Sequence, residues 1–164
     1  MSDKYAFTDN LVYPKEKEVL KYKGPEPFRF YGSGKKLFLD VFELAGKDIF
    51  EPKIKWDATG ETKTFWVKWE FAKNMDSWSK LKLSITFQGC QNSRTRLGEC
   101  SISMSPKFVT EVKTGFLQRY FWWMYYYLYY KNQRIYQFYR AKTIFNQFKL
   151  KVGEVYGMQV EESI

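Results

Sequence analysis

The sequence predicts an α+β fold in which a curved antiparallel sheet packs on a long C-terminal helix. From residue 50 to residue 112, apolar and polar side chains alternate, which is the pattern of strands with one buried face. After Thr114, apolar residues recur at helical spacing as far as Val152. The 164 residues suffice for one domain with a substantial core. We therefore expect a single domain over residues 1–164, with flexible tails at residues 1–18 and 153–164.

One strand and one short helix are predicted ahead of the alternating region. The strand is expected around Val19–Tyr22, which precedes a stretch rich in glycine and proline. The helix is expected over residues 34–46, because the leucines and the valine of this segment follow helical spacing. Ser33 is its predicted N-cap and Gly46 its predicted C-cap.

The alternating region predicts a series of hairpins. The dipeptide Gly60–Glu61 suits a two-residue turn, and centring a hairpin there pairs Trp56 with Phe65. Both side chains then lie on the apolar face, so the register agrees with the pattern. The next hairpin is expected to place Phe71 opposite Leu81. The remaining predicted strands cover residues 81–87, 102–104 and 108–112.

An uncharged aromatic stretch, YFWWMYYYLYY, occupies residues 120–130 of the predicted C-terminal helix. It is too short to cross a bilayer, which needs about 20 apolar residues. We therefore predict no membrane span and expect a cytoplasmic location. Lys131 and Arg134 would interrupt the apolar face of one straight helix, so a kink or a break is expected near Lys131.

The element order resembles the helix-grip fold of the START-like and birch-pollen-allergen superfamily. In addition, the stretches YKGPEPF (residues 22–28) and KWDATG (residues 55–60) are similar to small archaeal proteins of uncharacterised function. The superfamily resemblance implies binding of an apolar or aromatic small molecule between sheet and C-terminal helix. The sheet wall of this cavity would be Trp56, Phe65, Val67, Trp69, Leu83, Ile85, Phe87, Ile102 and Met104. The helix wall would be Tyr120, Trp123, Met124, Tyr127 and Phe138.

Two other functions remain open. The formal net charge of +9 favours acidic partners, and basic residues with an interleaved aromatic on one sheet face are typical of nucleic-acid binding. The residues of this possible polyanion patch are Lys53, Lys55, Trp66, Lys68, Lys82, Arg94 and Arg96. Alternatively, the aromatic helix could join a homodimer or a larger assembly through Trp122, Tyr126 and Tyr129.

The composition gives no support to catalytic or metal chemistry. There is no histidine, which removes the commonest general base and the commonest metal ligand. The two cysteines are predicted on opposite faces of the sheet, Cys100 inward and Cys90 outward, so a disulfide between them is disfavoured. GSGKK (residues 32–36) lacks the full phosphate-loop pattern. We predict no metal, no cofactor and no set of catalytic residues.

Overall fold

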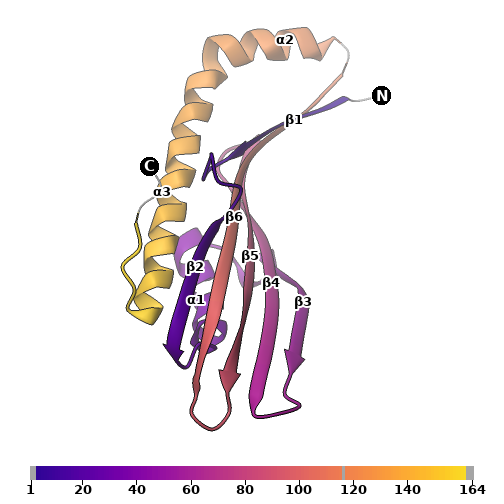
Figure 1. Ribbon diagram of the computed structural model, residues 1–164. Helices are drawn as coiled ribbons and strands as arrows, with labels where there is room; N and C mark the ends of the chain where they lie inside the picture. Colours follow the sequence, from indigo (N-terminus) through magenta and orange to yellow (C-terminus); the bar gives the residue numbers. More distant parts are fainter. Residues whose placement is uncertain (1–2, 116, 162–164) are drawn as a thin grey trace.

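The computed structural model describes residues 3–115 and 117–161, and in them six strands form one antiparallel sheet. The elements in chain order are β1 (Asp3–Asn10), β2 (Glu18–Pro25), α1 (Arg29–Phe42), η1 (Gly46–Asp48), β3 (Ile49–Asp57), β4 (Thr62–Asn74), β5 (Ser79–Asn92), β6 (Leu97–Thr114), α2 (Gln118–Tyr125), η2 (Tyr126–Tyr130) and α3 (Lys131–Tyr156). The strands lie in the order β1-β6-β5-β4-β3, and β2 also pairs with β6. The sheet is open, and α1 and α3 cover one of its faces (Figure 1). The predicted α+β fold with a long C-terminal helix is confirmed.

Strand β6 pairs with two different strands along one edge. Its first part pairs with β2 and its last part pairs with β1. The sequence predicted two separate strands here, but the structure has one continuous strand through Pro106. Proline is tolerated because it lies between the residues that pair with β2 and those that pair with β1.

The first predicted hairpin register is confirmed and the second is wrong by two residues. Trp56 pairs with Phe65, as expected from the turn at Gly60–Glu61. Phe71, however, pairs with Leu83 rather than with Leu81. The strands extend further than predicted, and the chain reverses in a short turn closed by the bond from the Met75 amide to the Ser79 carbonyl at 2.9 Å.

The N-terminal residues form a strand that the sequence analysis did not predict. Residues 3–10, placed within an expected flexible tail, are strand β1 and pair with residues 107–114. The chain then turns, with the Asn10 carboxamide accepting a bond from the Val12 amide at 3.0 Å and donating to the Lys15 carbonyl at 2.7 Å. Leu11 is buried in the core beside this turn.

Helix α1 begins five residues earlier and ends four residues earlier than expected. It starts at Arg29 and ends at Phe42, so Ser33 lies inside the helix and is not its N-cap. Glu43, in the left-handed conformation at φ 52°, takes the C-cap position that was predicted for Gly46. Phenylalanines at four-residue spacing, which the sequence analysis had not weighted, set the buried face.

The main core is a layer of aromatic rings between sheet and helices. Phe38 of α1 contacts Trp69 of β4, with ring centroids 5.5 Å apart, and also Phe148 of α3, at 5.6 Å. Phe108 of β6 meets Phe138 of α3 edge to face at 5.8 Å. These contacts hold both helices on the same face, which we call the inner face of the sheet. The opposite face is the outer face.

The C-terminal helical region bends where the sequence predicted a kink. Residues Tyr126–Tyr130 form a π-helical turn, and α3 begins directly after it at Lys131. Figure 1 shows α2 running across one end of the molecule and α3 descending along the sheet from this bend. A π turn inserts an extra residue into the helical ladder, which is a recognised cause of a sharp bend. Arg134 packs at the border of the core, with its guanidinium 5.4 Å from the centre of the Phe108 ring, and its charge pairs with Asp9 of β1.

The chain after α3 folds back on the helix. Gly157 is the C-cap in the left-handed conformation at φ 64°, and the Met158 amide donates to the Gly153 carbonyl at 2.9 Å. A Cβ at Gly153 would lie 2.5 Å from a methyl group of Val160. Residues 153–160, expected to begin a flexible tail, therefore include the last helical turn and a segment packed against it.

Candidate functional site

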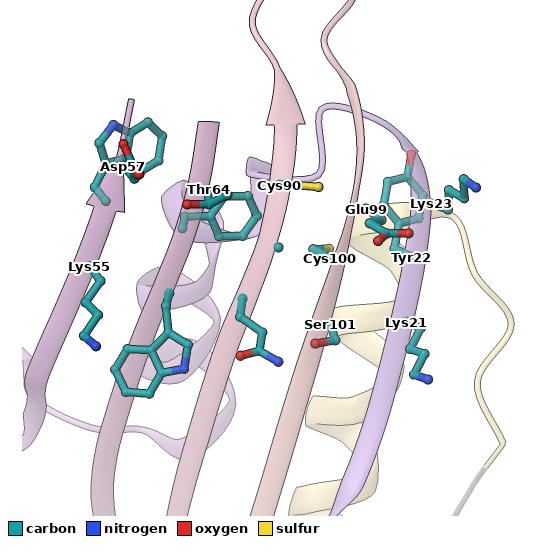
Figure 2. A pocket seen from close by; sticks show the side chains of 15 residues that line it. Lys21, Tyr22, Lys23, Lys55, Asp57, Thr64, Cys90, Glu99, Cys100 and Ser101 are labelled. Atoms are coloured by element: carbon teal, nitrogen blue, oxygen red, sulfur yellow. The ribbon is translucent and has the colours of Figure 1, made fainter. Parts of the chain in front are cut away.

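A groove of about 830 Å³ lies on the outer face of the sheet, at the end where the β3–β4 and β5–β6 hairpins close. Five strands contribute to it, and Figure 2 shows the helices behind them, on the other side of the sheet. Its outer-face lining residues are Lys21, Lys23, Lys55, Asp57, Thr64, Trp66, Gln88, Cys90, Glu99 and Ser101. The groove therefore lies on the face that the sequence analysis proposed for polyanions.

A single row of paired residues crosses the groove from edge to edge. The Cα partners, taken strand by strand from β3 to β2, are Lys55, Trp66, Gln88, Ser101 and Lys21. With neighbouring strands roughly 4.8 Å apart, this row is about 19 Å long. Figure 2 shows Lys55 and Lys21 at its opposite ends, with Ser101 next to Lys21. The row places an indole, an amide and a hydroxyl between two ammonium groups.

Further positive charge lies beside Trp66. The ammonium group of Lys53 lies 5.9 Å from the centre of the Trp66 ring, within the range of a cation–π contact. Both Lys53 and Lys55 are exposed, while Trp66 is half-buried between its neighbouring strands. The indole is therefore held on the sheet surface, with cationic groups within reach of anything stacked on it.

The neighbouring row, nearer the hairpin ends, carries two acidic groups. It runs through Asp57, Thr64, Cys90, Glu99 and Lys23. The Asp57 carboxylate accepts bonds from the hydroxyl and the amide of Thr59, and these bonds lower its pKa. Asp57 therefore stays ionised, and it is turned toward its own turn by these two bonds. The acidic side of the groove is thus the hairpin side.

Only part of the predicted polyanion patch belongs to this groove. Lys53, Lys55 and Trp66 lie at it, whereas Lys68 pairs with Glu70 at 2.5 Å. Arg96 pairs with Glu26 at 2.9 Å. Lys82 is one of three lysines around Glu111, and Arg94 is exposed in the loop between β5 and β6. Lys68 and Arg96 are therefore paired within the chain, whereas Lys82 shares the single carboxylate of Glu111 with Lys4 and Lys80.

The lysines of β2 were missed by the sequence analysis. Lys21 and Lys23 belong to the groove because β2 pairs with β6, about eighty residues further along the chain. Gln88 and Ser101 were seen on the outer face but were not assigned to a site. The alternation in VLKYK (residues 19–23) was a usable signal for the lysines, since it places both on one face of a strand.

The structure does not bring the two walls of the predicted ligand cavity together. Eight of the nine sheet residues are buried under α1 and α3, and only Trp56, at the edge, is exposed. In the helix wall, Phe138 lies against the core, while Tyr120, Met124 and Tyr127 are exposed on the α2–η2 segment. Trp123 is half-buried and contacts Phe7 of β1, at 5.8 Å between ring centroids. Ligand binding between these two walls stays a prediction.

Strand β1 covers most of the aromatic surface proposed for an interface. Phe7 stacks on Trp122 and on Tyr126, with ring centroids 6.1 Å apart in both cases. Tyr129, the third residue of that prediction, is exposed. The cover was not foreseen because β1 itself was not predicted.

A second, smaller pocket of about 430 Å³ lies where α2 crosses the end of β6. Its lining residues are Trp78, Val112, Lys113, Thr114, Gln118, Phe121, Trp122 and Tyr125. Two buried polar atoms of this lining, the Thr114 hydroxyl oxygen and the Trp122 indole nitrogen, have no hydrogen-bond partner within the protein. The pocket shares no residue with the predicted ligand cavity.

The cysteines lie on the faces predicted for them. Cys100 is buried on the inner face, with its sulfur 3.5 Å from the Tyr156 hydroxyl, and burial raises the pKa of its thiol. Cys90 lines the outer groove, and both thiols are free. Among the described residues, no group of three or more cysteine or acidic side chains is arranged to hold a metal ion.

No helix among residues 3–115 and 117–161 combines the length and the apolar character needed to cross a membrane. No protein-family model matches the chain, and no curated protein is similar to it in sequence.

Proposed function

We propose that the protein binds single-stranded nucleic acid in the groove on the outer face of its sheet. The observation that carries this proposal is the row of paired residues from Lys55 through Trp66 and Gln88 to Lys21. It combines the three kinds of group that single strands require: an aromatic face, hydrogen-bonding groups and flanking cations.

Each position in the row has a defined part in this proposal. Trp66 offers its indole face to an unpaired base, and such stacking does not depend on which base is present. Gln88 can both donate to and accept from a base edge, and Ser101 adds a hydroxyl beside it. Lys55 and Lys21, at the two ends, contact backbone phosphates on either side of the stacked base.

A single strand fits this surface better than a duplex does. In a duplex the faces of the bases are stacked on one another, so an indole lying on a sheet cannot reach them. The formal net charge of +9 adds a long-range attraction that brings any polyanion to the protein. The ion pairs that neutralise Lys68 and Arg96 lie outside the groove and leave its lysines available.

The proposal is tested by fluorescence anisotropy with a labelled single-stranded oligonucleotide and with a duplex of the same sequence. The two phosphate contacts, at Lys55 and Lys21, predict a roughly sevenfold loss of affinity between about 50 and 200 mM salt. Trp66→Ala should weaken binding by roughly 5- to 100-fold, because one stacking contact is lost. Lys55→Gln should lower the salt slope by about one unit, which marks the loss of a phosphate contact.

Lys36→Gln is the matched control, because Lys36 is an exposed lysine of α1 on the other side of the sheet. This substitution removes the same charge and should leave the affinity almost unchanged. Equal losses of affinity in Lys55→Gln and Lys36→Gln would mean that net charge alone drives binding. That result would reject the groove as the binding site. Tighter binding of the duplex than of the single strand would reject the stacking role of Trp66.

A further inference from the structure

The outward side of α2, together with its N-cap and the π turn η2 that follows, carries an exposed apolar stripe. Leu117, Phe121, Met124 and Leu128 follow a spacing of four, three and four residues, so they lie along one side of the helix. Their exposed fractions range from 56% to 73%. A contiguous apolar row of this kind on the surface marks a site of association.

Tyrosines border the stripe on both sides. Tyr120 and Tyr127 follow one edge at helical spacing, and Tyr125 and Tyr129 follow the other, and all four are exposed. Tyrosine has an apolar ring and a polar tip, and it is enriched where a membrane meets water. The stripe therefore has the graded polarity of a helix that lies in a bilayer interface.

The opposite side of the same helix is fixed to the sheet. Trp122 is buried there, with Phe7 of β1 stacked on it. Arg119 lies over the ring of Tyr5, at 5.3 Å from its centre. The stripe is thus presented by an anchored element, and Figure 1 shows α2 lying across one end of the molecule.

The segment of the sequence that carries the stripe is basic. Between Glu111 and Glu154, the sequence holds eight lysines and arginines and no aspartate or glutamate. Three of the eight, Arg134, Lys149 and Lys151, form ion pairs with Asp9, Glu18 and Glu154. The others are Lys113, Arg119, Lys131, Arg140 and Lys142. An apolar stripe within a purely basic segment is complementary to an apolar surface that carries anions.

The pocket beside the stripe supplies hydrogen-bonding groups for such a surface. The Trp122 indole N–H and the Thr114 hydroxyl are buried in its lining without a partner in the protein. Lys113 is exposed among the same lining residues, and Phe121 and Tyr125 belong to both the pocket and the stripe region. Two unpartnered donors next to an ammonium group suit a phosphate or glycerol oxygen.

We infer that α2 docks on a bilayer that contains anionic phospholipids. The stripe enters the boundary of the acyl chains, the tyrosines lie among the headgroups, and the pocket takes a headgroup oxygen. A second copy of the chain fits less well, because a symmetric contact would bring two purely basic segments together. Nucleic acid fits less well too, because Leu117, Met124 and Leu128 have no ring to stack on a base, which leaves Phe121 as the single ring of the stripe.

The test uses the full chain in sedimentation with lipid vesicles. Vesicles of phosphatidylcholine with phosphatidylglycerol should bind at least about tenfold more tightly than vesicles of phosphatidylcholine alone, since each engaged lysine or arginine contributes several-fold. The double variant Leu117→Gln with Leu128→Gln should lose roughly a hundredfold in affinity, about tenfold for each apolar side chain. Both side chains are exposed, so the fold does not depend on them.

Phe50→Gln with Leu97→Gln is the matched control, because it removes two equally exposed apolar side chains from the sheet. This control should bind the anionic vesicles as the wild type does. Thr114→Val should reduce binding to anionic vesicles several-fold, with no effect on the weak binding to neutral ones. Added inorganic phosphate should not release the protein, because the stripe supplies most of the affinity.

Three outcomes would overturn the inference. The first is the absence of binding to anionic vesicles. The second is an equal loss in the sheet control and in the stripe variant. The third is a dimer in analytical ultracentrifugation that the stripe variant dissociates while vesicle binding persists, since the stripe would then be a contact between copies. Oligonucleotide binding that depends on the stripe and not on Trp66 would instead reject the groove proposed above, so the two proposals fail separately.

Discussion

The hydroxyl of Tyr130 lies 2.5 Å from the hydroxyl of Ser79 in the interior, joining the C-terminal helix to strand β5. The bond is part of a chain that begins at the Arg134 guanidinium and ends at the Asp76 carboxylate. The first group can only donate and the last, when ionised, only accepts, so the direction of every hydroxyl between them is fixed. Thr110 donates to Ser79, Ser79 donates to Tyr130, and Tyr130 donates to Asp76.

Tyr130→Phe removes the central hydroxyl of this chain and should destabilise the protein. Ser79 and Asp76 would each lose a buried partner, which costs about 1 to 3 kcal/mol in the free energy of unfolding. Urea denaturation of both proteins measures this difference. Tyr129→Phe is the control, because the neighbouring ring is exposed and should change stability by less than about 0.5 kcal/mol. Equal effects of the two substitutions would contradict the role of the hydroxyl chain.

Alkaline pH should weaken the wild-type protein more than the Tyr130→Phe variant. Burial raises the pKa of Tyr130 from 10.0 to about 12. Above pH 10 the unfolded chain therefore releases a proton that the folded protein retains. The free energy of unfolding falls as the pH rises. The stabilisation is complete below pH 10 and should decline by about 2 kcal/mol by pH 12. Burial also raises the pKa of Tyr156, and that contribution is common to both proteins. Parallel stability curves over this range would contradict the prediction.

Glu111 holds three lysines on the outer face near β1. Lys4, Lys80 and Lys82 each lie 3.3 Å from its carboxylate, and the bonds from Lys4 and Lys80 are the main reason that its pKa falls to about 2. Glu111→Gln should destabilise the protein by about 1 kcal/mol at neutral pH, because water screens the partly exposed pairs and the three lysines then repel one another. High salt should shrink the difference.

The effect of Glu111 should also vanish in acid. Its pKa is depressed in the folded state, so its contribution is present above pH 4.5 and is lost as the pH falls toward about 2. Denaturation curves at neutral and acid pH measure this loss. Glu70→Gln is the control, since Glu70 pairs with Lys68 alone and is more exposed. A difference between Glu111→Gln and wild type that persists at pH 2 would rule out the ionic origin.

Local patterns in the sequence predicted most of this fold. The alternation of β4 and β5 is carried by residues two positions apart, and centring the hairpin on Gly60–Glu61 predicted the pairing of Trp56 with Phe65 correctly. The kink near Lys131 could be predicted because two charged side chains would otherwise fall on an apolar face. At Met75–Trp78 the register could not be derived, since this link holds no glycine dipeptide on which to centre a hairpin, and several pairings stay open.

The candidate site depends on long-range pairing, which local patterns do not reveal. Lys21 meets Ser101 only because β2 adds to the edge of β6, and nothing near Lys21 in the sequence specifies that neighbour. The same reason explains why β1 was missed: its cover over Trp122 depends on pairing with the last residues of β6. The ion pairs of Lys82 with Glu111 and of Arg96 with Glu26 likewise join distant segments. The sequence indicated which face of the sheet a side chain occupies and whether that face is polar. It did not indicate which residues from distant segments lie next to one another.

The last prediction concerns Gly89, where β5 and β6 approach closely at the groove. A Cβ there would lie 2.2 Å from the Glu99 carbonyl oxygen and 2.7 Å from the Cys100 Cα. Both are backbone atoms of the paired strand, so Gly89→Ala must push the two strands apart and should cost about 2 kcal/mol or more. Gly60→Ala, with nothing within 4 Å of the added methyl group, is the control and should be nearly neutral.

Because Gly89 follows Gln88 in the groove floor, the same displacement tests the site as well as the fold. Gly89→Ala should weaken oligonucleotide binding at temperatures where the variant is still fully folded, since Gln88 and Ser101 would no longer lie level with Trp66. Circular dichroism establishes the folded range, and anisotropy within it measures affinity. Unchanged affinity in a folded, destabilised variant would show that the middle of the row does not contact the strand.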